Sequence, residues 1–178
     1  MNIRTKIVVV ALGFSVVAAL APAATSRPSS SDKALRTRFF AHRGDFEKLV
    51  AMANEDSHLT RIASDFTWLD DDAAWPRNNV GISEKRWNDY KQLFREVGDP
   101  LGILKSDKPA RIEFPIFTVG SVPSGAAKGL VYSQSPLRPV LESLDTKPPE
   151  KYWNGTDRSH VLVYKAIGDH WYIFYEEG

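Results

Sequence analysis

Two apolar-rich runs near the end of the chain, HVLVYKAI (160–167) and HWYIFYE (170–176), flank the pair Gly168-Asp169. Both runs are rich in β-branched and aromatic residues, which favour strands. A Gly-Asp pair between two such runs is typical of a tight hairpin with a primed turn. The stretch therefore predicts a terminal β-hairpin. Its residues available to line the faces of a sheet are Val161, Val163, Trp171, Ile173 and Tyr175.

Upstream of this hairpin the chain offers further strand-like runs. Alternation of apolar and polar residues predicts a half-exposed strand over 60–69, and apolar runs predict strands over 102–105, 111–119 and 128–133. The Gly- and Ser-rich stretch 120–127 is predicted to be a loose hairpin loop. The segment 136–156 carries four prolines and is predicted to be a long connection with one helical turn around Leu141.

Two segments have the period of helices instead. A first helix is predicted to begin near Asp32 and to end at 54–56, with a kink at Gly44. Its apolar face consists of Leu35, Phe39, Phe46, Leu49 and Ala53. A second helix is predicted from the cap Ser83 to Gly98. Its apolar stripe consists of Trp87, Tyr90, Phe94 and Val97.

The order of these elements predicts an α+β fold. Two helices are expected to pack on one face of a mainly antiparallel sheet of about four to six strands that ends in the hairpin. We expect a single domain over residues 33–178, preceded by a small polar tether over 24–32 that is predicted to be disordered.

The first residues of the chain predict export. Arg4 and Lys6 precede an uncharged apolar run over 7–21, which is followed by an A-x-A site that predicts cleavage between Ala23 and Ala24. The run is short for a spanning helix, which needs roughly 20 residues, and an uncleaved anchor is the alternative. In both cases the positive-inside bias predicts an extracytoplasmic domain that is periplasmic, secreted or membrane-anchored.

Charge and composition restrict the partners. The chain has 23 Lys and Arg, 22 Asp and Glu, and no cysteine, so disulfides, thiol catalysis and thiolate metal sites are excluded. No basic patch or stripe suggests nucleic acid as a partner. Contact with a membrane is expected only through an uncleaved amino-terminal segment.

Four histidines are candidate general bases. His42 falls at a seam position of the first predicted helix, where an edge-of-core side chain is the alternative to a base. His58 lies in a polar turn, where a solvated role is the alternative. His160 and His170 fall at opposite ends of the predicted hairpin, too far apart to share a metal ion.

The other chemical motifs are incomplete. Asp70, Asp71 and Asp72 lack the alternating spacing and the glycine of a calcium loop, and a solvated loop or a cluster of charges at the end of a strand is predicted there. The loop 120–125 lacks the spacing of a G-x-S-x-G nucleophile motif. No glycine-rich phosphate-binding motif is present, and neither a metal nor a cofactor is predicted.

Two tryptophans lie in polar, proline-bearing connections instead of on an apolar face. Trp75 is close to Arg77, and Trp153 lies between Tyr152 and Asn154. Exposed tryptophans beside polar residues are typical of binding surfaces, although each indole folding back over the sheet is the alternative. The sequence therefore favours a non-catalytic binding module that engages a protein, peptide or envelope component.

A small extracytoplasmic hydrolase is the alternative function. It would use His42 or His160 with an aspartate, because the two groups need only meet in space. A pocket that joins a histidine to Asp65 or to the loop 70–72 would favour this alternative.

Overall fold

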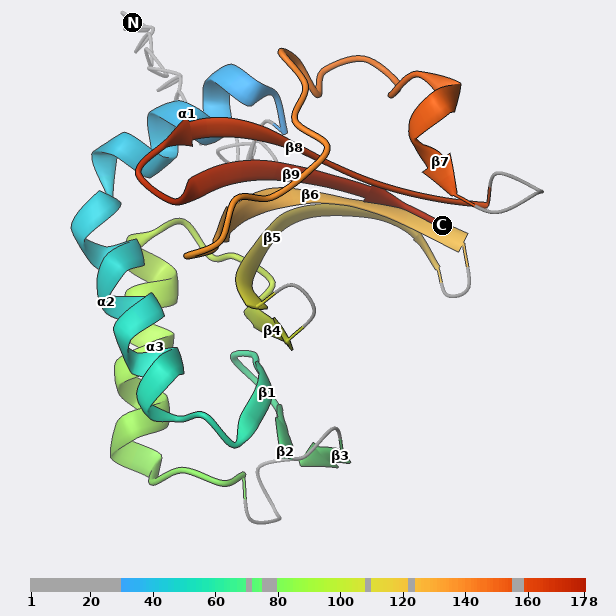
Figure 1. The fold of residues 1–178 in the computed structure, drawn as a ribbon. Helices are drawn as coiled ribbons and strands as arrows, with labels where there is room; N and C mark the ends of the chain where they lie inside the picture. Colours follow the sequence, from blue (N-terminus) through green and yellow to red (C-terminus); the bar gives the residue numbers. More distant parts are fainter. Residues whose placement is uncertain (1–29, 70–71, 75–79, 108–109, 122–123, 155–158) are drawn as a thin grey trace, which may run out of the picture.

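A computed structural model describes residues 30–69, 72–74, 80–107, 110–121, 124–154 and 159–178. The predicted signal peptide and the cleavage site between Ala23 and Ala24 lie outside these ranges. Within them, the chain forms one curved antiparallel sheet, and three α-helices lie along one side of it (Figure 1). The predicted α+β class is confirmed. The predicted numbers of two helices and four to six strands are wrong, since three helices and nine strands occur in the described ranges.

The terminal hairpin is present as β8 (His160–Gly168) and β9 (Trp171–Glu177). Its turn residues are Asp169 and His170, with φ of 30° and 69°, one position later than the Gly168-Asp169 turn expected from the sequence. A register shift between Ala166 and Gly168 explains the displacement, because it adds one residue to β8 before the turn.

The order of strands across the sheet is β3-β2-β1-β4-β5-β6-β9-β8-β7. Beside the hairpin lie two long strands, β5 (Ala110–Ser121) and β6 (Ser124–Tyr132), followed by β4 (Ile103–Asp107). The predicted loose loop over 120–127 is wrong in large part, because Gly120 pairs with Gly125 and the ladder continues beyond them. Strand pairing overrides the weak strand propensity of Gly and Ser there.

The single strand predicted over 60–69 is a hairpin of two short strands, β1 (Leu59–Ile62) and β2 (Thr67–Leu69). The amide of Ala63 donates to the carbonyl of Phe66 and closes the turn between them. An additional strand, β3 (Asp72–Ala74), pairs with β2 and forms one edge of the sheet. The alternation of apolar and polar residues continues across the tight turn between β1 and β2. The turn is therefore not evident from the sequence.

The long connection 136–156 differs from its prediction in detail. No helical turn occurs around Leu141; Val140 instead forms a parallel bridge with Tyr164 of β8. A 3₁₀ turn occurs later, at Glu150–Tyr152, and leads into the two-residue strand β7 (Trp153–Asn154) at the second edge of the sheet. The edge of β8 is thus covered by two pieces of the same connection.

The first predicted helix is two helices, α1 (Asp32–Ala41) and α2 (Arg43–Glu55). The chain breaks at His42, with φ −125° and ψ 24°, and not at Gly44. The cap is Ser31, whose hydroxyl accepts from the amide of Ala34. The third helix, α3 (Glu84–Glu96), has the predicted cap Ser83 and the predicted buried stripe.

The main core lies between the helices and the face of the sheet that they cover. Its centre is Trp171, which is 2% exposed and contacts the rings of Phe39, Phe46, Phe114 and Tyr132. None of the helices in the described ranges is both long enough and apolar enough to span a bilayer.

A buried ionic cluster attaches the beginning of α1 to the sheet. Asp32 lies between Lys128 of β6, 2.8 Å away, and Lys165 of β8, 3.0 Å away. Lys128 also donates to Asp145 and to the carbonyl of Leu144, in addition to its ion pair with Asp32. The cluster therefore stabilises the position of α1 and leaves no free amine for chemistry.

Candidate functional site

A pocket with a cavity volume of about 650 Å³ lies between the β1–β2 hairpin, the end of α3 and the part of β5 that continues beyond β4. We call it the Arg61 pocket. Its lining residues are Arg61, Ala63, Ser64, Asp65, Phe66, Lys91, Phe94, Arg95, Asp99, Pro100, Leu101 and Thr118. Its size falls in the range of small-molecule and peptide side-chain sites, about 300–1,000 Å³.

Glycine at position 102 allows the loop after α3 to close on this hairpin. Gly102 has φ +102°, and a Cβ there would lie 2.4 Å from the carbonyl oxygen of Ile62. A side chain is thus excluded both by conformation and by space. Leu101, which precedes this glycine, and Ala63 of the hairpin both line the pocket.

Arg61 is held in the pocket by aromatic rings. It pairs directly across β1 and β2 with Trp68, so the two side chains share a face of the sheet. Its guanidinium carbon lies 5.3 Å from the centre of the Trp68 ring and 5.0 Å from that of Phe66. Both are distances at which a cation is attracted to an aromatic face.

The hydrogen-bond donors of Arg61 are open. Its Nε is buried and has no acceptor, and the guanidinium makes no hydrogen bond or ion pair with any residue in the described ranges. Burial lowers the pKa of Arg61, and the charge of Asp65 offsets this only in part. Arg86 offers a contrast, since it donates to Asp56, to Glu55 and to the carbonyl of Met52. Arg61 is therefore a half-buried cation without a protein acceptor.

Charges of both signs surround this cation. Lys91 and Arg95 lie one turn apart on α3 and so project from the same side of the helix. Asp65 and Asp99 are exposed at the rim, on the β1–β2 turn and after α3. The apolar part of the wall includes Phe94, which is buried, and Leu101, which is 45% exposed.

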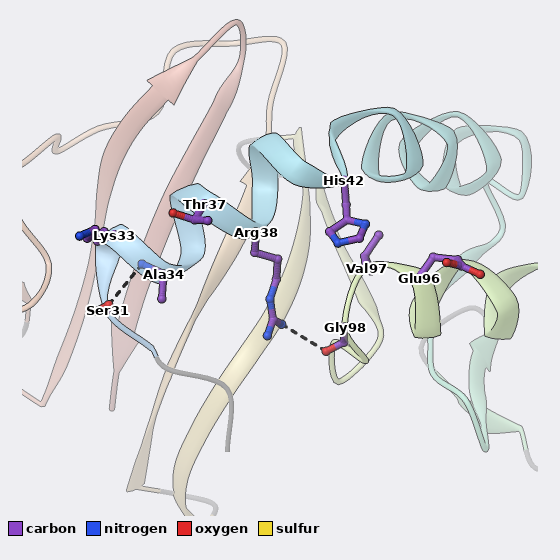
Figure 2. A pocket seen from close by; sticks show the side chains of 9 residues that line it. All are labelled: Ser31, Lys33, Ala34, Thr37, Arg38, His42, Glu96, Val97 and Gly98. Atoms are coloured by element: carbon purple, nitrogen blue, oxygen red, sulfur yellow. Dashed lines mark hydrogen bonds between the residues drawn. The ribbon is translucent and has the colours of Figure 1, made fainter. Parts of the chain in front are cut away.

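A second pocket, of about 560 Å³, lies between α1 and the end of α3 (Figure 2). Arg38 crosses it and donates to the carbonyl of Gly98 over 3.2 Å, so this arginine serves to hold α1 against the end of α3. His42 lies beside Val97 and Glu96 in the same view. The Nδ1 of His42 lies 4.0 Å from the Oδ2 of Asp45.

The remaining histidines lie apart from these pockets. The Nε2 of His58 is 2.8 Å from the carbonyl oxygen of Gly81. His160 pairs with Glu176 at 3.0 Å, and both side chains are exposed by about 40%. No histidine lines the Arg61 pocket, which is where Asp65 lies. The described part of the chain brings together no group of three or more metal-ligating side chains.

Of the predicted binding residues, Trp75 and Arg77 lie outside the described residues, as do Asp70 and Asp71. Trp153 is half-buried and packs against the main core; its indole N–H donates to the carbonyl of Pro148. Trp153 is in β7, which forms one edge of the sheet. Trp75 follows β3 in the sequence, and β3 forms the opposite edge.

Arg61 was missed by the sequence analysis because it falls on the polar side of an alternating run, where an arginine is expected to face solvent. A signal was nevertheless present: the turn brings Phe66 and Trp68 back beside it. Recognising that signal requires the turn between β1 and β2 to be known.

We expect Arg61→Met to leave the free energy of unfolding within about 0.5 kcal/mol of the unmodified protein, or to raise it. Methionine keeps the contacts with the aromatic rings and removes a buried charge that has no partner. Chemical denaturation followed by fluorescence measures the change. The matched control is Arg86→Met, which removes charged hydrogen bonds and is expected to cost about 1–3 kcal/mol. Equal losses in both variants would show that Arg61 has a structural role.

Comparison with known protein families, curated proteins and solved structures finds no match to this chain.

Proposed function

We propose that this protein is a non-catalytic binding module that works outside the cytoplasm and holds an anionic group of its ligand in the Arg61 pocket. The observation that carries the proposal is the half-buried guanidinium of Arg61, which lines the pocket and has no acceptor among the described residues. Leaving a buried donor unpaired costs about 1–3 kcal/mol, and more when the group is charged. An anionic group of a ligand that pairs with the guanidinium would offset this cost.

The surroundings of Arg61 support binding over catalysis. The guanidinium lies within cation–π distance of two aromatic rings, and no residue in the described ranges accepts a hydrogen bond from it. The pocket contains no histidine among its lining residues, and its two aspartates are exposed. The arrangement is suited to hold an anion.

The extracytoplasmic location is supported by the amino-terminal sequence, with Arg4 and Lys6 before an uncharged apolar run. The partner is proposed to be a protein, peptide or envelope component. Trp75, Arg77 and Trp153 remain predicted contact residues for it, and the exposed part of the Trp153 indole is available for such a contact.

Affinity capture tests this function. The full chain, with a tag at its carboxyl end, is incubated with envelope extract of its own cells, and the retained molecules are quantified by mass spectrometry. Arg61→Met is expected to retain at least about tenfold less of the specific partner, because a charged hydrogen bond contributes about 1.5–3 kcal/mol. Arg36→Met is the matched control: Arg36 also lies over an aromatic ring, that of Phe40, but on the exposed side of α1.

Retention of the same partner in the same amount by the unmodified chain and by Arg61→Met would contradict the proposed site. Should Trp153→Ala reduce retention while Arg61→Met does not, the contact surface lies at the β7 edge of the sheet instead.

A further inference from the structure

Resting on the proposed function, we infer that the Arg61 pocket selects a ligand with a single carboxylate joined to an apolar group. Three features of the pocket carry this inference: the geometry of the unpaired guanidinium, the balance of charge around it, and the apolar residues of the lining.

The geometry favours a planar anion. The guanidinium carbon of Arg61 lies 5.0 Å from the centre of the Phe66 ring and 5.3 Å from that of the Trp68 ring. The donors that remain lie in the plane of the group, in a fork that matches the two oxygens of a carboxylate. An ammonium group in the same place would act as a point charge without this preference.

The balance of charge favours a single negative charge. The lining residues include three cations, Arg61, Lys91 and Arg95, and two carboxylates, Asp65 and Asp99. The pocket thus has an excess of one positive charge. A monoanion neutralises this excess, whereas a phosphate dianion would be repelled by the two aspartates at the rim.

The wall of the pocket supplies a place for the apolar part. Leu101 is 45% exposed although Phe94 and Pro100 beside it are buried. An aromatic or branched aliphatic group attached to the carboxylate would cover Leu101 and remove its side chain from water. Two kinds of ligand combine a carboxylate with an apolar group in this way: a free carboxylic acid and the carboxyl end of a peptide.

Isothermal titration calorimetry of the full chain with N-acetylphenylalanine and with its carboxamide tests the inference. The two probes differ only in the charge of the terminal group. The carboxylate is expected to bind at least about tenfold more tightly than the amide, and Arg61→Met is expected to abolish that difference. Arg36→Met is expected to preserve it. 3-Phenylpropanoate, which lacks the peptide group, separates the two sources: weaker binding than N-acetylphenylalanine indicates a peptide end, and equal binding a free acid.

Equal affinity for the acid and the amide, or tighter binding of inorganic phosphate than of N-acetylphenylalanine, would overturn the inferred ligand class. The proposed function has a separate test. If an Arg61-dependent partner is captured from envelope extract while neither carboxylate probe binds, the ligand class is wrong and the binding function stands. Failure of both experiments overturns both.

Discussion

Replacing Trp171 with alanine is expected to lower the free energy of unfolding by about 3–5 kcal/mol, the range for large aromatic truncations in a core. Trp171 is 2% exposed and contacts the aromatic rings of Phe39 and Phe46 from the helices and of Phe114 from β5. Its loss leaves a cavity at the point where helices and sheet meet. Urea denaturation followed by circular dichroism measures the effect.

The matched control is Phe40→Ala, which removes an aromatic ring that is 49% exposed on α1. This substitution is expected to change the free energy of unfolding by no more than about 0.5 kcal/mol in either direction. The lost contacts are few, and alanine is the better helix former. If the two substitutions cost the same, Trp171 is not the centre of the core and the packing of α1 and α2 on the sheet is incorrect.

Replacing Lys128 with methionine is expected to cost about 3–5 kcal/mol, because it leaves the buried carboxylate of Asp32 without one of its two lysine partners. Lys128 lies 2.8 Å from Asp32 and from Asp145, and the side chains of Lys128 and Asp32 are each 6% exposed. The substitution Asp32→Asn in the same chain is expected to recover part of this loss, since it removes the uncompensated charge. Lys33→Met, on the exposed side of α1, is the control and is expected to be near neutral.

The same cluster sets the stability of the protein in acid. Burial opposes ionisation of Asp32, but hydrogen bonds from Lys128, the Leu144 amide and Lys165 outweigh it and lower its pKa from 3.8 to about 2. A carboxyl with a lowered folded-state pKa contributes full stability above its unfolded pKa and loses it as the pH falls. The contribution of Asp32 is therefore expected to decrease between about pH 4 and pH 2. In Lys128→Met this acid dependence is expected to be weaker, and an identical pH profile for both proteins would argue against the cluster.

The elements with strong local signals were predicted well. The stripe of α3 with its cap Ser83, and the strands of the terminal hairpin, follow from periodicity and capping chemistry that act within a few residues. The predictions that failed depend on contacts distant in sequence. Gly120 is in a strand because Gly125 pairs with it, and the β1–β2 turn interrupts a run whose alternation continues across it.

The candidate site could not be predicted for the same reason. Arg61, Lys91 and Leu101 come from three elements that the fold assembles, and none of them departs from a pattern in its own segment. The Gly102 conformation that brings two of these elements together is also invisible locally. The tryptophans of the polar connections, by contrast, stand out in sequence; Trp153 proves to be half-buried against the core.

The most direct measurement of the central claim is the nuclear magnetic resonance spectrum of the arginine Nε–H groups during titration with N-acetylphenylalanine. The account predicts that the Arg61 Nε–H signal shifts and saturates with the affinity found by calorimetry, because the ligand carboxylate pairs with the guanidinium to which this N–H belongs. The signals of Arg36, which is exposed on α1, and of Arg86, which is already paired, are expected to stay in place. An Arg61 signal that does not move at saturating ligand would contradict the account.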